Sequence, residues 1–443
     1  MTDTIFALAT PFGRSGVAVI RISGSAANDS LSHFGITPLP APRKAHYCSF
    51  ILPASDEVLD RGLVLSFPAP HSFTGEDCIE FQIHGSIAVI KKVLAELSGL
   101  PHFRMAEPGE FARRAFLNNK FDLTAAEGLV DLIEAETEMQ RQQASHSALG
   151  HAAKFYNQLR SEIIHSLAFL EAYIDFPDED IPPSVYAQVE DEVAKVTLTI
   201  QTILANSENA EKIREGFTVV ILGAPNAGKS TLLNALAKRD AAIVSDRAGT
   251  TRDLIEVHLD LHGLPVTLID TAGIRETSDD IESEGIKRAL AKAEHADVKL
   301  VLFDSTLPLD PSTRAIIDDT TIVVFTKAEQ QKVPSAPPNS MRCLNQLSVS
   351  ALDSSTLSPL LLAIENHLAI HAKPTEAAVV TRQRHRDHLV AALDQLALFE
   401  GEKSLELQCE RIRLAAVEVG KITGHIQVDE LLGVIFSSFC IGK

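Results

Sequence analysis

The chain of 443 residues is poor in the features that mark several protein classes. It has no tryptophan and only four tyrosines, so there is no aromatic-rich surface to interpret. Its cysteines, at positions 48, 78, 343, 409 and 440, fit neither a C-x-x-C motif nor a zinc spacing, which indicates free thiols in a reducing compartment. No segment approaches the roughly 20 apolar residues of a membrane span, and the first residues lack the basic start of a secretory signal. We therefore expect a cytoplasmic protein with no membrane association.

Positive charge is also scarce, because 40 Lys and Arg residues face 59 Asp and Glu residues and leave a net charge of −19. Such an acidic chain is a poor candidate for broad electrostatic binding to nucleic acid, so a nucleic-acid partner would need a local basic patch. Two clusters are candidates for such a patch, and each could equally be a solvated face: Arg104, Arg113, Arg114 and Lys120, and then Arg382, Arg384 and Arg386.

The chain is long enough for about three domains. Residues 1–118 contain β-like runs at 17–22 and 62–67 between Pro-, Ser- and Gly-rich stretches, which predicts a small α+β domain. Residues 119–214 and 373–443 carry apolar residues at helical spacing, at 159, 163, 167, 170 and 174 and again at 405, 409, 412, 416 and 419. We predict a discontinuous helical domain with an α/β nucleotide domain, residues 215–372, inserted into it.

The most informative motif lies at 219–230, where the apolar run VVIL enters GAPNAGKS. This is a phosphate-binding loop in the strand-then-helix context that makes the match credible. Its glycines let backbone N–H groups close around a triphosphate, and the N-terminus of the following helix favours anionic oxygens. Lys229 would reach the β- and γ-phosphates, and the Ser230 hydroxyl would coordinate Mg²⁺. The residues predicted to bind nucleotide here are Asn226, Ala227, Gly228, Lys229, Ser230 and Thr231.

Two downstream segments narrow the prediction to a GTPase. A β-like run enters Asp270, Thr271, Ala272 and Gly273, which is how switch GTPases place a carboxylate and a glycine beside the γ-phosphate. Between the two motifs lies a polar loop whose Thr251 is a candidate second Mg²⁺ ligand. The loop residues predicted to bind are Ser245, Asp246, Arg247, Ala248, Gly249, Thr250 and Thr251.

Two later loops stand where a guanine-reading loop and its supporting loop should fall. The first is Thr326, Lys327 and Glu329, and the second is Ser350, Ala351 and Leu352. Each short motif alone is weak, but five in the correct order behind strand-like runs are a strong signal. Glu329 departs from the usual aspartate, and its extra methylene must be absorbed by backbone movement or weaken the contact with the base.

The ordered motifs TGED (74–77), PGEF (108–111), FDLTAAE (121–127), AGTTRD (248–253), DTAG and the terminal SSFCIGK resemble the MnmE (TrmE) family of tRNA-modification GTPases, in the TrmE-Era-EngA-YihA-Septin-like class. The resemblance covers essentially the whole chain. It implies an N-terminal folate-binding domain that forms a homodimer, a discontinuous helical domain and an inserted Ras-like P-loop GTPase domain. It also implies an FAD-dependent partner, MnmG (GidA), in a heterotetramer or larger complex, and tRNA whose wobble uridine gains a carboxymethylaminomethyl or aminomethyl group at C5.

The resemblance further implies ligands and roles. Asn226 matches a potassium ligand, with Ser245, Arg247 and Thr250 completing the shell around K⁺, and such an ion beside the phosphates can neutralise developing charge. Glu282 matches a catalytic glutamate that positions water, since the usual switch glutamine is replaced by Ile274. Without the resemblance, Glu282 would be interpreted as part of a solvated acidic loop.

The resemblance also implies a pocket for 5-formyltetrahydrofolate or a related tetrahydrofolate, formed by Arg21, Glu80, Lys120 and Lys443. Cations suit the glutamyl carboxylate of a folate, and a carboxylate suits the donor edge of its pterin. Cys440 is implied to matter for modification. It could otherwise be a buried thiol or the cysteine of a C-a-a-X box, although terminal lysine is not a favoured X.

Two other functions share the nucleotide domain. A ribosome-associated switch GTPase of the Era/EngA type would typically append a basic RNA-binding module, which this acidic chain does not show. An ATP-using P-loop enzyme is compatible with Glu329 but would not need the AGTTRD loop or DTAG in this register. Nucleotide competition and folate binding discriminate the three functions.

Overall fold

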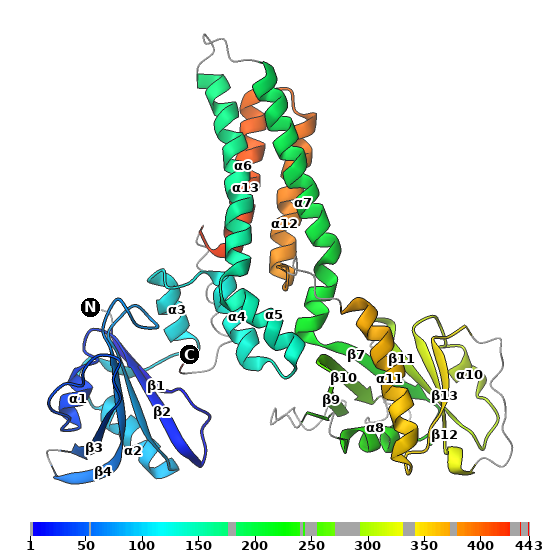
Figure 1. Cartoon of the computed structure of the whole chain (residues 1–443), viewed down its shortest axis with the longest axis horizontal. Helices are drawn as coiled ribbons and strands as arrows, with labels where there is room; N and C mark the ends of the chain where they lie inside the picture. Colours follow the sequence, from blue (N-terminus) through cyan, green and yellow to red (C-terminus); the bar gives the residue numbers. More distant parts are fainter. Residues whose placement is uncertain are drawn as a thin grey trace, which may run out of the picture. The chain divides into compact units, whose positions relative to one another are not determined.

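The computed structural model describes residues 3–52, 55–175, 183–239, 242–243, 255–270, 293–330, 342–372, 379–425, 435 and 442. The predicted binding residues 245–251 and 271–273, together with Glu282, Cys440 and Lys443, lie outside this described part. The chain forms two compact units, and Figure 1 labels most of their helices and strands. One comprises residues 1–130, 147–189 and 395–443, and the other comprises residues 131–146 and 190–394. The domain boundaries expected from the sequence stay predictions.

The first unit contains a six-stranded sheet in the order β3-β4-β5-β2-β1-β6, antiparallel except for the parallel pair β1 and β6. Alternating apolar residues of its strands face helices α1 and α2, so Ile20, Phe81 and Val93 are fully buried in one core. The strands predicted at 17–22 and 62–67 are confirmed. The bounds are β1 Thr4–Leu8, β2 Ser15–Ser23, α1 Asp29–His33, β3 His46–Leu52, β4 Glu57–Phe67, β5 Cys78–Gly85, α2 Ile87–Ser98 and β6 Phe103–Met105.

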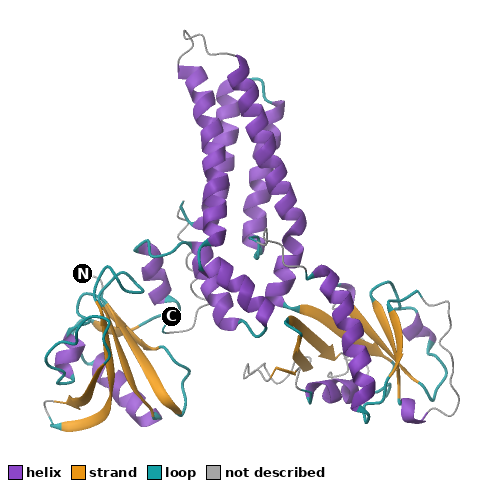
Figure 2. Cartoon of the chain, viewed as in Figure 1, coloured by secondary structure: helices purple, strands orange, loops and turns teal. Residues whose placement is uncertain are grey.

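Helices follow this sheet in the sequence and return after the second sheet. Figure 2 shows these helices in purple and the strands of the two sheets in orange. The two predicted apolar stripes are confirmed, because they lie on α6 and α13, which pack against each other. Among the described residues no helix is long and apolar enough to cross a bilayer. The helices are α3 Glu110–Leu117, α4 Leu123–Glu134, α5 Glu138–Ala148, α6 His151–Asp175, α7 Pro183–Glu215, α12 Gln383–Gly401 and α13 Leu405–Thr423.

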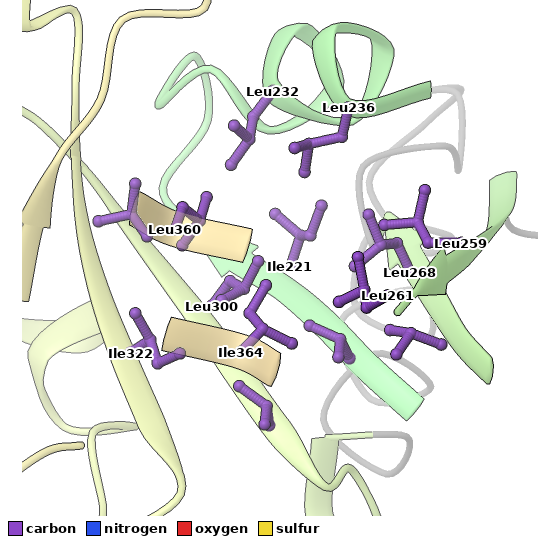
Figure 3. Packing of buried hydrophobic residues seen from close by; sticks show 14 of the residues in the cluster. Ile221, Leu232, Leu236, Leu259, Leu261, Leu268, Leu300, Ile322, Leu360 and Ile364 are labelled. Atoms are coloured by element: carbon purple, nitrogen blue, oxygen red, sulfur yellow. The ribbon is translucent and has the colours of Figure 1, made fainter. Parts of the chain in front are cut away.

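The second unit contains a seven-stranded sheet in the order β13-β12-β11-β7-β10-β9-β8, in which β7 and β10 to β13 are parallel. Four of these strands, β7 and β10 to β12, are nearly continuous apolar runs, as expected for strands buried on both faces, whereas the edge strand β13 is polar and partly exposed. On one face, α8 and α11 place Leu232, Leu236, Leu360 and Ile364 around Ile221 (Figure 3). The bounds are β7 Phe217–Gly223, α8 Lys229–Ala237, β8 Ala242–Ile243, β9 Ile255–Leu261, β10 Leu264–Asp270, β11 Val298–Asp304, α10 Pro311–Arg314, β12 Thr321–Thr326, η1 Ala328–Gln330, β13 Asn345–Ser348 and α11 Ser354–His371.

A single residue, Gly216, joins α7 to β7. Its φ of +90° lies in the region that favours glycine, and its N–H donates to the Lys212 carbonyl at 2.8 Å. The Asp297 carboxylate contacts both elements next to Gly216. It accepts the N–H of Thr218 on β7 at 2.8 Å and forms an ion pair with the ammonium of Lys212 on α7. The last turn of α7 and the first strand of the nucleotide domain are therefore fixed to each other.

Candidate nucleotide-binding site

The phosphate loop begins where β7 ends, and its backbone requires unusual conformations. Gly223 has φ +151°, and a Cβ there would stand 2.6 Å from the Leu302 carbonyl oxygen of β11. Asn226 and Gly228 adopt left-handed conformations with φ values of 62° and 93°. Helix α8 then begins at Lys229, so the loop presents a helix N-terminus to its ligand. The predicted strand, loop and helix are all present in the expected order.

The Lys229 ammonium lies within this loop. Its Nζ donates to the carbonyl oxygens of Gly223 at 2.8 Å and Ala224 at 3.0 Å. Burial lowers the pKa of Lys229, and the negative charge of Asp270 partly opposes that shift. The cation is thus held half-buried at the position from which a P-loop lysine contacts phosphate oxygens.

Ser230 and Asp270 meet at the carboxyl ends of two neighbouring parallel strands. The Ser230 Oγ donates to the Asp270 Oδ2 at 2.7 Å, and Asp270 has no exposed surface. Asp270 ends β10, which pairs with β7 so that Asp270 lies opposite Ile221. A hydroxyl and a carboxylate oxygen at this edge form the oxygen donor set that Mg²⁺ prefers.

Thr326 connects the predicted base-reading loop to the phosphate loop. Its Oγ1 donates to the Ala227 carbonyl at 2.7 Å and lies 3.2 Å from the Phe303 carbonyl. Thr326 is the last residue of β12 and is buried, so this contact fixes the end of the strand against the phosphate loop. The hydroxyl of Thr326 therefore makes a direct tie between the two loops, although asparagine is more usual at this position.

Lys327 forms an ion pair with Asp304 at the end of β11. Lys327 has φ 56°, and its ammonium is half-buried beside the nearly buried Asp304 carboxylate. Burial alone would raise the pKa of Asp304, but hydrogen bonds from Lys327 and Thr306 hold that pKa below its usual value. Sequence reasoning missed Asp304, although an aspartate that closes an apolar run at the sheet edge was an available signal.

Glu329 and Ser350 bring the two base-side loops together. Glu329 lies on the exposed turn η1, and a hydrogen bond from the Ser350 side chain lowers the pKa of Glu329. The Ser350 Oγ also accepts the Leu352 N–H at 3.3 Å, while the Leu352 side chain is 84% exposed. Ala351 is half-buried between them. The structure thus places a carboxylate at the edge where a guanine base would be recognised.

The residues predicted to bind a folate lie in the first unit. Arg21 and Glu80 are cross-strand neighbours on β2 and β5, and Arg21 Nε contacts Glu80 Oε1 at 3.0 Å. The exposed Lys120 donates to the Pro70 carbonyl at 2.7 Å. Gly442 is buried, and a Cβ there would stand 2.4 Å from the Leu8 carbonyl. The residue before Lys443 therefore lies at the end of β1.

The two basic clusters are partly neutralised by carboxylates. Arg104 and Arg114 both pair with Glu110, and Arg114 also pairs with Glu76. In the second cluster, Arg382 pairs with Asp131 at 2.6 Å. These guanidinium groups make internal ion pairs, which weakens the interpretation of either cluster as a free nucleic-acid patch.

The phosphate loop, its Ser–Asp pair and the base-side loops at the carboxyl edge of a parallel sheet define a P-loop nucleotide-binding protein. A model of the MnmE helical domain matches residues 123–440, and a model of the N-terminus of the GTP-binding protein TrmE matches residues 4–120. The chain belongs to the MnmE (TrmE) family of tRNA modification GTPases.

Full-length relatives agree with these matches. The tRNA modification GTPase MnmE of Paramagnetospirillum magneticum is 46% identical over 447 residues, and that of Rickettsia akari is 46% identical over 449 residues, each covering 100% of both chains. Among solved structures, Aquifex aeolicus Era bound to GDP and AlF₄⁻ is 24% identical and covers 42% of this chain and 68% of that chain, with a TM-score of 0.28.

Proposed function

We propose that this GTPase hydrolyses GTP to drive modification of tRNA at C5 of the wobble uridine, together with an FAD-dependent partner of the MnmG (GidA) type. The contact between Ser230 and Asp270 beside Lys229 carries the nucleotide part of the proposal, because it assembles the phosphate and Mg²⁺ groups of a switch GTPase at one edge. The chemistry on the wobble uridine, as a carboxymethylaminomethyl or aminomethyl group, rests on the family resemblance.

The oxygens of Ser230 and Asp270 fit a Mg²⁺ site, and Thr251 would add a further ligand. Bound Mg²⁺ would neutralise charge on the phosphates. Asn226, whose φ of 62° is fixed within the phosphate loop, would hold K⁺ with Ser245, Arg247 and Thr250. Glu282 would position the attacking water. The roles of Thr251, Glu282 and the other K⁺ ligands rest on the resemblance alone.

The first unit would bind 5-formyltetrahydrofolate or a related tetrahydrofolate near Arg21 and Glu80. Their ion pair is partly exposed on the face of the sheet opposite the apolar core, so a ligand can reach both groups. The position of Gly442 beside Leu8 supports a contribution from Lys443. Cys440 would take part in modification.

We also propose a homodimer formed through the first unit. The sheet face opposite the core carries the cross-strand run Tyr47, Leu63, Gln82 and Val19, and Tyr47 is 67% exposed. Tyr47, Leu63 and Val19 are apolar and at least partly exposed, and apolar side chains gathered on one sheet face are typical of an association surface. Sedimentation of the wild type and of Tyr47→Asp tests it, since a lasting monomer in the wild type contradicts the proposal.

A protein acting on tRNA with GTP is expected in the cytoplasm.

The decisive experiment is tRNA modification in vitro with purified MnmG, GTP, a tetrahydrofolate and an amine donor. Mass spectrometry of the wobble nucleoside should show the modified uridine only when the wild-type chain is present. Lys229→Ala is the matched negative control, because it removes the ammonium from the phosphate loop. Modification that proceeds equally without this chain, or equally with ATP alone, would overturn the proposal.

A further inference from the structure

A second polar pair lies beside the Arg21–Glu80 pair on the same face of the sheet. Ser23 and Cys78 are cross-strand partners, two residues after Arg21 on β2 and two residues before Glu80 on β5. Residues two apart on a strand share a face and are separated by about 7 Å. Ser23, Cys78 and the adjoining Thr74 are buried, with 0%, 3% and 0% exposure. The turn at 73–77, the TGED segment with its preceding Phe73, is anchored on this pair.

The side chains of Ser23, Thr74, Cys78 and Glu76 form a chain of hydrogen bonds in which each hydroxyl or thiol donates to the next group. The Ser23 hydroxyl donates to the Glu76 Oε2 at 2.7 Å, so its single proton is used. The hydroxyl of Thr74, 2.7 Å away, must therefore donate to Ser23, and the Cys78 thiol, 3.2 Å from Thr74 Oγ1, must donate to Thr74. Thr74 Oγ1 also accepts the Glu76 N–H at 3.2 Å. The chain of donors starts at Cys78 and ends on the Glu76 carboxylate.

Charged residues on α3 and just before it also hold the 73–77 turn in place. Arg114 contacts both oxygens of Glu76 at 3.3 and 3.1 Å and donates to Glu110 at 3.0 Å. Arg104 adds contacts of 2.8 and 2.6 Å to the two oxygens of Glu110. The side chains of Arg114 and Glu110 are only 12% and 11% exposed, so the charge-assisted bond between these two is shielded from water. The turn is thereby fixed to both the sheet and α3.

This anchored turn contacts two of the three cations of the predicted folate pocket, Arg21 and Lys120. Phe73, which precedes Thr74, places its ring centroid 5.0 Å from the Arg21 Cζ. Gly75, which follows Thr74, has φ +81°, and a Cβ there would stand 3.2 Å from the Lys120 Cδ. Asn118 donates to the Thr74 carbonyl at 2.7 Å and so fixes the segment that carries Lys120.

We propose that Thr74 and Glu76 are positioning residues for the tetrahydrofolate site, because they hold the 73–77 turn that places Phe73 over Arg21 and Gly75 against Lys120. This inference rests on the proposed folate binding. Neither residue needs to touch the ligand. Each acts by keeping Arg21 and Lys120 at a fixed separation, and preorganised groups bind more tightly than groups that must be ordered on binding.

The test compares two substitutions at one buried position in the full-length chain. Thr74→Val keeps the shape but removes the donor and acceptor, whereas Thr74→Ser keeps both. Titration with 5-formyltetrahydrofolate should give a Kd about tenfold or more higher for Thr74→Val and within about threefold of wild type for Thr74→Ser. Glu76→Gln should also raise the Kd by about tenfold, because it removes the charge that Arg114 holds.

Glu96→Gln is the matched control, since it breaks the Lys92–Glu96 pair in the same unit without touching the turn. Its folate Kd should stay at the wild-type value, and the circular dichroism spectrum and thermal unfolding of each variant check that the first unit is folded. If Thr74→Val fails that check, Glu76→Gln decides the test. Wild-type protein that does not bind the folate overturns both proposals. Wild-type binding with unchanged Kd in Thr74→Val or Glu76→Gln, or an equal loss in Thr74→Ser, overturns only the positioning role.

Discussion

The Ser230 Oγ donates to the Asp270 Oδ2 at 2.7 Å, which joins the phosphate loop to the end of the neighbouring strand. Hydroxyl and carboxylate are thus already aligned at one edge of the sheet, and both are oxygen ligands of the type that Mg²⁺ takes. The pair fixes where the metal and the phosphates should meet, and it leads to the first prediction.

Ser230→Ala should weaken binding of GTP in Mg²⁺ by about tenfold or more, since it removes a ligand that acts through the metal. In EDTA the variant and the wild type should bind mant-GTP with nearly equal affinity. Ser358→Ala, which changes an exposed serine on α11, is the control and should match wild type in both buffers. A Mg²⁺ response of Ser230→Ala equal to that of wild type would remove Ser230 from the metal site.

Hydrolysis should depend on the monovalent cation. Because Asn226 is held in the phosphate loop where a K⁺ ligand is predicted, the rate should be much higher in K⁺ than in Na⁺. Asn226→Ala should abolish that difference while mant-GTP still binds. Steady-state phosphate release in matched chloride salts measures both. Equal wild-type rates in the two salts would contradict the potassium mechanism.

Guanine should be preferred over adenine in spite of the longer side chain at 329. The Glu329 carboxylate is already hydrogen-bonded by Ser350 at the base-side edge and remains exposed, so it can accept two ring donors. Glu329→Asp should keep or sharpen the preference, whereas Glu329→Ala should lose most of it, about tenfold or more. Direct titration with GTP and ATP checks this. Comparable wild-type affinities for the two nucleotides would refute it.

Glu282→Ala should separate binding from turnover. In this proposal Glu282 positions water and makes no contact with ground-state phosphate, so GTP affinity should stay within a small factor. The kcat should fall by roughly two orders of magnitude or more. Affinity and single-turnover hydrolysis are measured on the same variant, together with tRNA modification, which should fall with the rate. Near-normal hydrolysis, or an affinity loss as large as the rate loss, would leave Glu282 as a solvated loop residue.

Nucleotide binding should weaken at alkaline pH through Lys229. Burial lowers the pKa of Lys229 in the nucleotide-free protein, and phosphate contact requires the charged ammonium. GTP affinity should therefore begin to fall at a pH below the ordinary lysine value of about 10.4. The unfolded chain holds this proton more tightly, so the nucleotide-free protein should gain stability as pH rises through the same interval. Lys229→Arg is the control, because its guanidinium does not titrate there. A wild-type profile as flat as that of Lys229→Arg would contradict the prediction.

Local patterns in the sequence predicted much of the fold. The run 219–222 before Gly223 and the apolar spacing at Leu159 and Ile163 depend on short-range rules of strand burial and helix periodicity, and the structure contains the expected elements. The order of five motifs along the chain predicted a GTPase domain, and the strands that carry the described motifs are parallel neighbours in one sheet. These features follow from neighbours in sequence and from the parallel arrangement of the sheet.

The contacts that complete each site were less accessible from the sequence. Asp304 pairs with Lys327 across 23 positions, and Arg114 reaches Glu76 across 38. Nothing in the local pattern distinguishes these charges from solvated ones, because their partners are chosen by strand register and helix placement. The same limit applied to Arg104 and Arg114, which a sequence shows only as a basic cluster.

The one-residue joint at Gly216 has a mechanical consequence. Only Gly216 separates α7 from β7, and Asp297 contacts residues on both sides of it. The strand therefore cannot rotate independently of the helix end. A rotation of β7 that follows a change at the phosphate loop must also move the last turn of α7. The end of α7 is therefore coupled to the strand that leads into the phosphate loop.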